Sequence, residues 1–174
     1  KLIGDDKCCG MPKLDLGDLK SVEKLMKQNT PILLNEIEAG FDIISLVPSC
    51  VLMFKQELPL LFDENEDLKI IKQHVFDPFE YLSDRESKGL MNKEFKNSLG
   101  KIAYQVACHQ RVQNIGPKTK ELLELVPDTE VQAIERCSGH DGTYAVKEET
   151  HKNSVKIARP VSRKVDEIEP DHLT

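Results

Sequence analysis

Strand-like and helix-like segments alternate through the second half of the chain, and this alternation restricts the fold more than any other feature. Residues 101–107, KIAYQVA, and 130–136, EVQAIER, are short apolar runs that favour strands, and residues 116–126 between them have helical spacing. A longer helical pattern covers roughly residues 143–168. Strands that alternate with helices of this length pair in parallel and are flanked by helices, which predicts an α/β fold.

The first half carries related patterns. Residues 17–40 have apolar side chains at helical spacing, with Thr30 and Pro31 as the end of one helix and the start of another, and Gly40 as the final stop. Residues 41–47, FDIISLV, then form a short apolar run. Such a run predicts a strand that is buried on both faces.

Two further helices and a connector complete this pattern. We expect a helix over residues 49–62 that is interrupted near Pro59, and a helix over residues 77–89 that begins at a proline and stops at a glycine. Residues 86–100 are polar and contain three lysines and two glycines, which indicates a connector. The sequence therefore predicts two pseudo-repeated α/β units, over residues 1–94 and 95–174.

Composition narrows the class of protein. The chain of 174 residues has 24 basic and 30 acidic residues, a formal net charge of −6, which leaves no electropositive surplus for nucleic acid. Its longest apolar runs are far shorter than the roughly 20 residues of a membrane span. Five cysteines and no signal-peptide pattern argue against a disulfide framework and favour a reducing, cytoplasmic location.

Adjacent cysteines occur near the start of the chain, in the segment DDKCCGMP. A disulfide between Cys8 and Cys9 would be strained, which disfavours a thiol–disulfide module. Two neighbouring thiolates can instead reach one metal centre, with Gly10 giving the backbone freedom to approach it. The other interpretation is that both are small buried hydrophobic residues, and the dipeptide alone leaves the two interpretations open.

The adjacent cysteines have a counterpart later in the chain. RCSGHD matches KCCGMP with an offset of 129 residues, so that Cys137 matches Cys8, Ser138 matches Cys9 and Gly139 matches Gly10. The same offset places the counterpart of Cys50 at about position 179, beyond Thr174. We therefore expect a window on a duplicated protein, truncated at both ends, with metal absent or substoichiometric in this fragment.

These motifs carry a family resemblance. A lone cysteine after a strand (ACHQR), a CCG element and a later PSC element, in this order and partly repeated, resemble the CCG (cysteine-rich) domain iron–sulfur oxidoreductases. That family includes subunits of heterodisulfide reductase, glycolate oxidase and anaerobic glycerol-3-phosphate dehydrogenase. The stretches RCSGHDGT and ACHQRVQNIG are most similar to the branch of the family formed by the C subunits of the anaerobic glycerol-3-phosphate dehydrogenases.

The resemblance implies a set of cluster ligands. It assigns three cysteines to a first site and two to a second, as cofactor-binding and metal-binding residues: Cys8, Cys9 and Cys50, then Cys108 and Cys137. Thiolates are the ligands that iron–sulfur clusters and zinc prefer, and the family pattern implies a 4Fe–4S cluster in the full-length protein, with zinc as the alternative.

Two positions depart from the family pattern. Val47 stands where the complete motif has a cysteine, and Ser138 stands where CCG has its second cysteine. Each departure removes a ligand, so neither site can have five cysteines in this chain.

The histidines divide into two groups. His109 and His140 lie next to cysteines of the second site and are candidates to bind the metal or donate a hydrogen bond to a cluster sulfur. A loop position satisfied by the backbone is the alternative for both. His74, His151 and His172 have polar neighbours, which predicts surface positions.

Two functions of different classes follow. The resemblance implies an electron-transfer subunit, not an autonomous enzyme, that takes electrons from a flavin-containing dehydrogenase partner and delivers them to a quinone or another acceptor. It also implies a cytoplasmic protein at the inner face of the membrane, with no membrane span in this chain. The alternative is a structural zinc-binding or protein-interaction module with degenerate motifs, which the missing ligands at Val47 and Ser138 favour.

Overall fold

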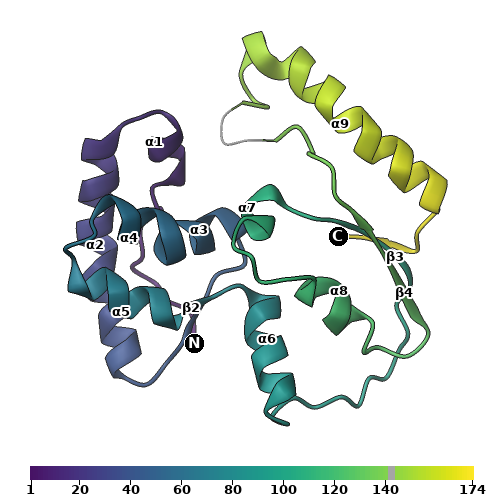
Figure 1. Cartoon of the computed structure of the whole chain (residues 1–174), viewed down its shortest axis with the longest axis horizontal. Helices are drawn as coiled ribbons and strands as arrows, with labels where there is room; N and C mark the ends of the chain where they lie inside the picture. The colour runs from purple at the N-terminus through teal and green to yellow at the C-terminus, as the bar shows by residue number, and fades with distance from the viewer. Residues whose placement is uncertain (141–143) are drawn as a thin grey trace. The chain divides into compact units, whose positions relative to one another are not determined.

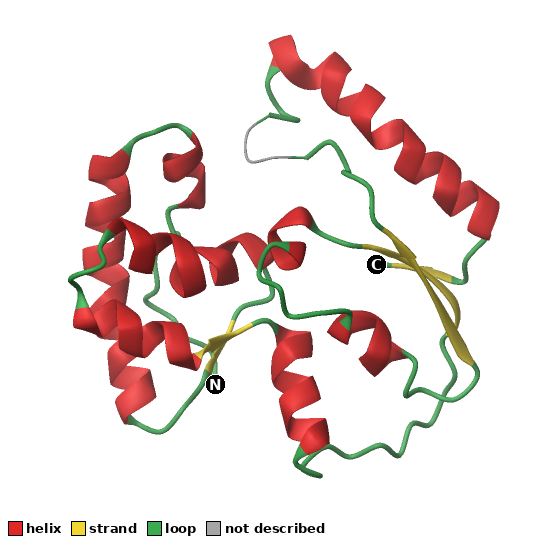
Figure 2. Ribbon diagram, viewed as in Figure 1, coloured by secondary structure: helices red, strands yellow, loops and turns green. Residues whose placement is uncertain are grey.

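The computed structural model describes residues 1–140 and 144–174, and the described chain divides into two compact units. The first covers Lys1–Pro78 and the second covers Phe79–Thr174. Figures 1 and 2 show the helices and strands of each unit. The division falls earlier than the expected boundary after residue 94, because the helix that begins at Pro78 contacts the second unit: Lys118 Nζ donates a hydrogen bond to Ser83 Oγ over 3.3 Å.

Helices dominate the first unit. In chain order its elements are α1 (Met11–Asp15), α2 (Leu19–Glu38), β1 (Ile43–Ile44), α3 (Pro48–Leu52), the π-helix η1 (Met53–Glu57), α4 (Leu58–Leu61), α5 (Glu66–His74) and β2 (Val75–Phe76). Strands β1 and β2 pair in parallel, Ile43 opposite Val75. The core is formed where α2, η1, α4 and α5 pack together, and it contains the fully buried side chains of Val22, Met53, Leu58, Leu68 and Ile71.

Helix α2 corrects one sequence-based expectation. It runs without a break from Leu19 to Glu38 through Pro31, so the predicted end and restart at this proline is wrong. Burial of one face of the helix outweighs the missing backbone donor of Pro31, and Thr30 Oγ1 donates a hydrogen bond to the carbonyl oxygen of Met26 in the same turn. The predicted stop is confirmed, because Gly40 follows the C-cap in the left-handed region at φ 87°.

The next segments agree in kind with the sequence patterns and differ in detail. Strand β1 is shorter than the apolar run that predicted it, and Ile44 is 45% exposed, so burial on both faces is wrong. The interruption of the following helix is the π-helical turn η1, and Pro59 lies in the first turn of α4. The predicted proline start and glycine stop of the next helix are confirmed in α6 (Pro78–Ser87), with Gly89 in the left-handed region.

A three-stranded parallel sheet organises the second unit. Its elements after α6 are β3 (Gly100–Gln105), α7 (Cys108–Arg111), α8 (Lys118–Leu123), β4 (Thr129–Ile134), α9 (Glu148–Ile168) and β5 (His172–Leu173), and the strand order is β4-β3-β5. The predicted last helix therefore begins later than residue 143 and ends where expected; residues 141–143 lie outside the described part. The α/β class with parallel strands flanked by helices is confirmed.

Both faces of this sheet are covered by apolar packing. Alternate residues of β3 point to opposite faces: Ile102 and Tyr104 pack in a cluster with Leu123 of α8, and Ala103 packs in a cluster with Ile168 of α9. Figure 1 shows α8 and α9 on opposite sides of β3 and β4. The result is a helix–sheet–helix sandwich in which the carboxyl ends of β3 and β4 lead directly into the cysteine segments.

Candidate functional site

The CCG element of the first unit sits where the N-terminal segment enters α1. Gly10 is the N-cap of α1 and has φ 97°, a left-handed conformation that favours glycine. An added Cβ there would lie 3.5 Å from Met53 Cε, an ordinary contact, so the backbone conformation and not space requires the glycine. The turn leaves Cys9 buried and Cys8 exposed.

Cys50 reaches the same place from another part of the chain. It lies in the first turn of α3, which begins after β1 with Val47 as N-cap and Pro48 in the first turn. Its backbone N–H donates a hydrogen bond to the carbonyl oxygen of Val47 over 2.9 Å. Val47, where the sequence resemblance implies a further cysteine, has a half-exposed side chain.

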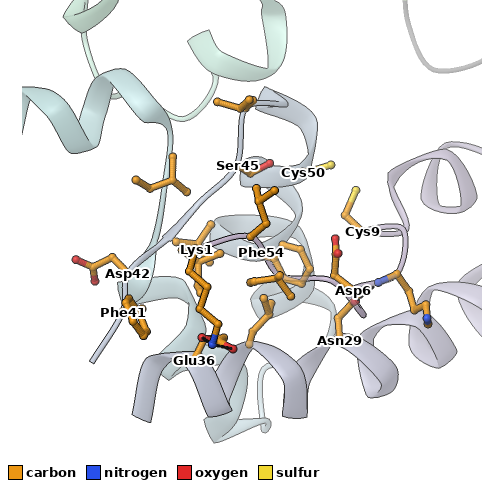
Figure 3. A pocket seen from close by; sticks show the side chains of 18 of the residues that line it. Lys1, Asp6, Cys9, Asn29, Glu36, Phe41, Asp42, Ser45, Cys50 and Phe54 are labelled. Carbon is orange, nitrogen blue, oxygen red and sulfur yellow. Dashed lines mark hydrogen bonds and ion pairs between the residues drawn. The ribbon is translucent and has the colours of Figure 1, made fainter. Parts of the chain in front are cut away.

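All three cysteines of the predicted first site line one pocket of about 630 Å³. Figure 3 shows the sulfur atoms of Cys9 and Cys50 pointing toward one another across this pocket. The rest of the pocket wall has both apolar and polar side chains. Phe41 and Phe54 contribute apolar surface. The polar residues of the wall are Lys1, Asp6, Lys7, Asn29, Glu36, Asp42 and Ser45. Glu36 is bound by Lys1 Nζ, which lies 2.8 Å from its Oε1 and belongs to the same wall.

The two facing thiols differ in acidity. The hydrogen bond with Cys9 lowers the pKa of Cys50 from 9.0 to about 7, against an opposing effect of burial. The same hydrogen bond, followed by burial, raises the pKa of Cys9 well above its ordinary value. Above about pH 7 the pair therefore holds one proton, with Cys50 as the thiolate that accepts a hydrogen bond from the Cys9 thiol.

The predicted residues of the second site lie at one edge of the second sheet. Gln105 of β3 is in register with Ile134 of β4, and Cys108 and Cys137 each lie three residues beyond these strand ends. Parallel strands end at the same edge, so both cysteines leave the sheet there. Both side chains are exposed, and Cys137 Sγ accepts a hydrogen bond from the backbone N–H of Gly139 over 3.3 Å.

Gly139 is more tightly enclosed than its counterpart Gly10. It has φ 76°, and an added Cβ would lie 2.3 Å from the carbonyl oxygen of Ser154 in α9. Ser154 Oγ donates a hydrogen bond to the carbonyl oxygen of Gly139 over 2.7 Å. The RCSG segment is thus fixed directly against α9.

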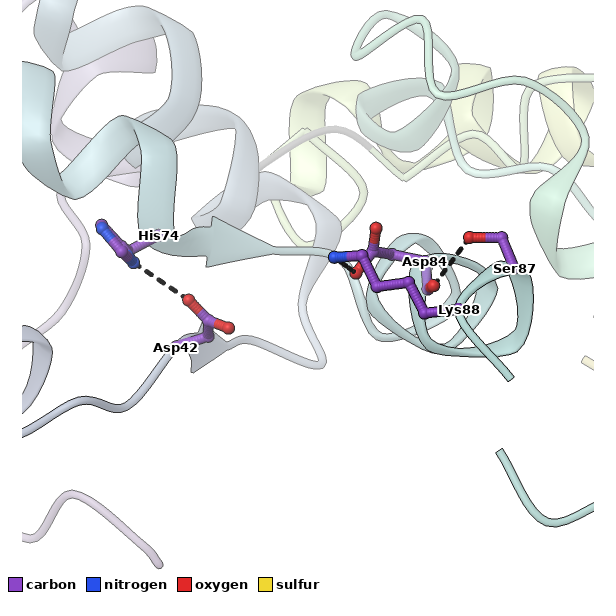
Figure 4. Close-up of polar contacts among 5 residues, drawn as sticks. All are labelled: Asp42, His74, Asp84, Ser87 and Lys88. Carbon is purple, nitrogen blue, oxygen red and sulfur yellow. Dashed lines mark hydrogen bonds and ion pairs between the residues drawn. The ribbon is translucent and has the colours of Figure 1, made fainter. Parts of the chain in front are cut away.

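The histidines are distributed over both units. His140 is exposed and His109 half-buried, and neither belongs to a described cluster of ligands. His151 and His172 are exposed, as predicted. His74 is half-buried rather than fully on the surface, because its Nδ1 lies 3.0 Å from Asp42 Oδ1, a contact that joins the end of α5 to the start of β1 (Figure 4).

Cysteine thiols are the ligand type that an iron–sulfur centre requires, but the three cysteines of the first unit are not all brought together. Within residues 1–140 and 144–174, no three His, Cys, Asp or Glu side chains are close enough to hold a metal ion. Cys9 and Cys50 face one another, whereas Cys8 lines the same pocket with an exposed side chain. A shared centre in the first unit therefore requires the Cys8 side chain to turn toward the other two.

Asn29 is a site residue that sequence reasoning missed. It lies on the buried face of α2 between Met26 and Leu33, and its side chain is 2% exposed. An amide at the i+3 position of an apolar helix face is the signal that was available, because a buried polar side chain needs hydrogen-bond partners. Its partners are the backbone of Lys7 and Cys8.

The second unit is similar in sequence to a known protein family. Residues 102–173, which run from β3 to β5, match the family described as cysteine-rich domain (CCG). The predicted resemblance to that family is confirmed for the second unit.

Two curated relatives extend the similarity over both units. The chain is 25% identical over 173 residues to the C subunit of anaerobic glycerol-3-phosphate dehydrogenase from Escherichia coli K12, and equally to that of strain O157:H7. Each alignment covers 98% of this chain and 43% of the relative, so the chain spans less than half the length of these relatives. No solved structure matches the chain.

Proposed function

We propose that the chain is part of an iron–sulfur subunit that transfers electrons between a flavin-containing dehydrogenase subunit and a quinone or another acceptor. The observation that carries the proposal is the convergence of Cys8, Cys9 and Cys50 on one pocket in a chain similar to a dehydrogenase subunit. An iron–sulfur cluster, when bound, supplies one-electron transfer, and thiolates are its usual ligands.

The residues of the first unit have distinct roles in this proposal. Cys50, whose pKa is lowered to about 7, forms a thiolate more readily than an ordinary cysteine, and Cys9 offers a buried sulfur beside it. Cys8, exposed at the pocket mouth, is the third ligand, and the left-handed Gly10 sets the turn that presents both neighbouring cysteines. In the second unit we assign the same role to Cys108 and Cys137 at the carboxyl edge of the sheet.

The location follows from the same proposal. No helix within the described residues combines the length and the apolar character that a membrane span requires. Delivery of electrons to a quinone would place the protein at the inner face of the cytoplasmic membrane through another subunit of the complex.

The alternative is a structural zinc or protein-interaction module. It is favoured by Val47 and Ser138 at positions where the family pattern has cysteines, and by the lack of a preformed three-ligand group among the described residues. Zinc binds thiolates without labile sulfide and without visible colour.

Metal analysis separates the two proposals. The chain is purified without oxygen, loaded with ferrous iron and sulfide, and assayed for iron, acid-labile sulfide, zinc and visible absorption. Because this chain carries only part of each ligand set, we expect substoichiometric iron and sulfide in the wild type. This content should be lost in Cys8→Ser and Cys9→Ser and reduced in Cys50→Ser, while Cys137→Ser leaves the first site as in the wild type. Zinc without sulfide would support the alternative, and unchanged metal content in all three first-unit variants would contradict a shared site.

A further inference from the structure

The segment that carries the adjacent cysteines is attached to the first unit at few points. The side chains from Gly4 to Cys8 are exposed, whereas Cys9 and Gly10 are buried. Among the described residues, the backbone of this exposed stretch is held by hydrogen bonds from one side chain, Asn29. The position of Cys8 therefore depends on a contact that comes from the middle of α2.

Asn29 makes two hydrogen bonds to consecutive residues of the segment. Its Oδ1 accepts a hydrogen bond from the Lys7 N–H over 2.7 Å, and its Nδ2 donates one to the Cys8 carbonyl oxygen over 3.1 Å. The amide of Asn offers an acceptor and a donor side by side, which an alanine at this buried position could not replace. The two bonds hold the peptide groups on either side of the Lys7–Cys8 pair, Asp6–Lys7 and Cys8–Cys9, which sets where the Cys8 side chain leaves the backbone.

The second unit achieves the same attachment with a different residue. With the offset of 129 residues the position of Asn29 is taken by Ala158, which offers no hydrogen bond. Ser154, one turn earlier in α9, instead donates its hydroxyl hydrogen bond to Gly139. Each unit therefore has one buried polar side chain on its long helix that bonds the backbone of its cysteine segment.

We propose that Asn29 is a positioning residue that holds the Cys8–Cys9 segment in the pocket facing Cys50, and that Ser154 is its counterpart in the second unit. The effect of Asn29 on thiol positions stands on these contacts alone. Its effect on a bound cluster rests on the proposed function.

The first test measures thiol exposure in the metal-free chain. Alkylation of Cys9 by iodoacetamide, followed by mass spectrometry, is compared in the wild type and in Asn29→Ala. We expect Cys9 to react about tenfold faster in the variant, because losing two buried hydrogen bonds lets the segment open more often. Asn29→Asp keeps the acceptor for Lys7 and loses the donor for Cys8, so we expect an intermediate rate.

Thr30→Ala is the matched control. Thr30 is the adjacent residue of α2, is also buried and has one side-chain hydrogen bond, to Met26 within the helix. We expect this variant to leave the Cys9 rate within about twofold of the wild type. Equal acceleration in Asn29→Ala and Thr30→Ala would overturn the proposal, because it would show general loosening of α2. If Asn29→Ala does not fold, the comparison of Asn29→Asp with Thr30→Ala decides the matter.

The second test measures the loaded chain. With iron and sulfide we expect lower occupancy and an altered electron paramagnetic resonance spectrum in Asn29→Ala, and neither change in Thr30→Ala. If the wild type binds no cluster but Cys9 is alkylated faster in Asn29→Ala than in the wild type, the proposed function fails and the positioning role stands. If the wild type is loaded and Asn29→Ala matches it in thiol rate, occupancy and spectrum, the positioning role fails.

Discussion

The two units share a left-handed glycine, a long helix and a short strand in and after their cysteine segments. Gly10 and Gly139 are both left-handed, α2 and α9 both begin nine residues later, and both helices contain a proline at the same place, Pro31 and Pro160. Strands β1 and β5 follow at the same offset of 129 residues, Ile43 against His172. The duplication that the cysteine motifs suggested therefore extends to backbone conformation.

The surroundings of these elements differ between the units. Helix α2 packs against α5 and α1 and buries Asn29, whereas α9 packs on β3 and β4 and buries Ser154. The first cysteine segment approaches a pocket with a second thiol, Cys50. The second lies against the backbone of α9. The left-handed turn at the cysteines is therefore common to both units, while the side chains that hold it in place differ.

The largest expected difference between the units is at the two glycines. Gly139→Ala forces a side chain into the left-handed region and places Cβ 2.3 Å from the Ser154 carbonyl oxygen, so we expect the second unit to lose about 3 kcal/mol of unfolding free energy or more. Gly10→Ala meets only the conformational cost, about 1–2 kcal/mol.

Hydrogen exchange read peptide by peptide checks this difference, because it reports each unit separately. Gly116→Ala is a suitable control, since that glycine is also left-handed but has no atom within 4 Å of an added Cβ. Equal losses for Gly139→Ala and Gly116→Ala would show that the close contact with α9 carries no cost.

A second difference concerns the chemistry of the first pocket. Because the pKa of Cys50 is lowered to about 7, we expect its alkylation rate to rise with pH and level off above about pH 8. Cys9→Ala removes the hydrogen bond that causes the lowering, so the midpoint should move upward toward 9.0. At pH 7 this corresponds to a loss of roughly tenfold in rate or more, if the pKa returns fully.

The stability of the first unit should follow the same titration. A folded-state pKa below that of the unfolded chain contributes stability that is fully present above the unfolded value, 9.0, and is lost as the pH falls through about 7. The raised pKa of Cys9 acts in the opposite sense, and because both shifts come mainly from the same hydrogen bond, Cys9→Ala should remove the part of the pH dependence that these two thiols cause. If Cys50 is alkylated with the same midpoint pH in the wild type and in Cys9→Ala, the hydrogen bond with Cys9 is not the cause of the lowered Cys50 pKa.

Much of this architecture could be predicted from the sequence because its signals are local. Short apolar runs on either side of a helical segment indicated β3 and β4, and the glycine after each helix indicated the stops at Gly40 and Gly89. The continuous helix through Pro31 could not be predicted, because the packing that outweighs the proline comes from residues distant in sequence. The boundary at Pro78 depends likewise on a tertiary contact of α6.

The candidate site divides in the same way. The adjacent cysteines and their counterparts were visible as motifs, and the family resemblance selected Cys50 to join them. The hydrogen bond between Cys9 and Cys50 and the two bonds of Asn29 depend on how α2 and α3 lie against the N-terminal segment. No pattern in the sequence encodes that placement, although a buried amide on an apolar face indicates that some backbone partner exists.

The smallest expected difference concerns one polar pair in each unit, both drawn in Figure 4. In the second unit Lys88 Nζ lies 2.7 Å from Asp84 Oδ2 at i,i+4 spacing at the end of α6, and we expect Lys88→Ala to cost about 0.3–0.5 kcal/mol. In the first unit Asp42 and His74 join two elements distant in sequence, so Asp42→Ala should cost more, up to about 1 kcal/mol.

Urea unfolding at low and high salt checks the order of these two effects. The Lys88→Ala loss should vanish at high salt, because exposed charges are screened there, whereas part of the Asp42→Ala loss should persist because a hydrogen bond to His74 Nδ1 is removed as well. A larger loss for Lys88→Ala would reverse the order, and would mean that α6 depends on its own surface pairs more than β1 depends on its contact with α5.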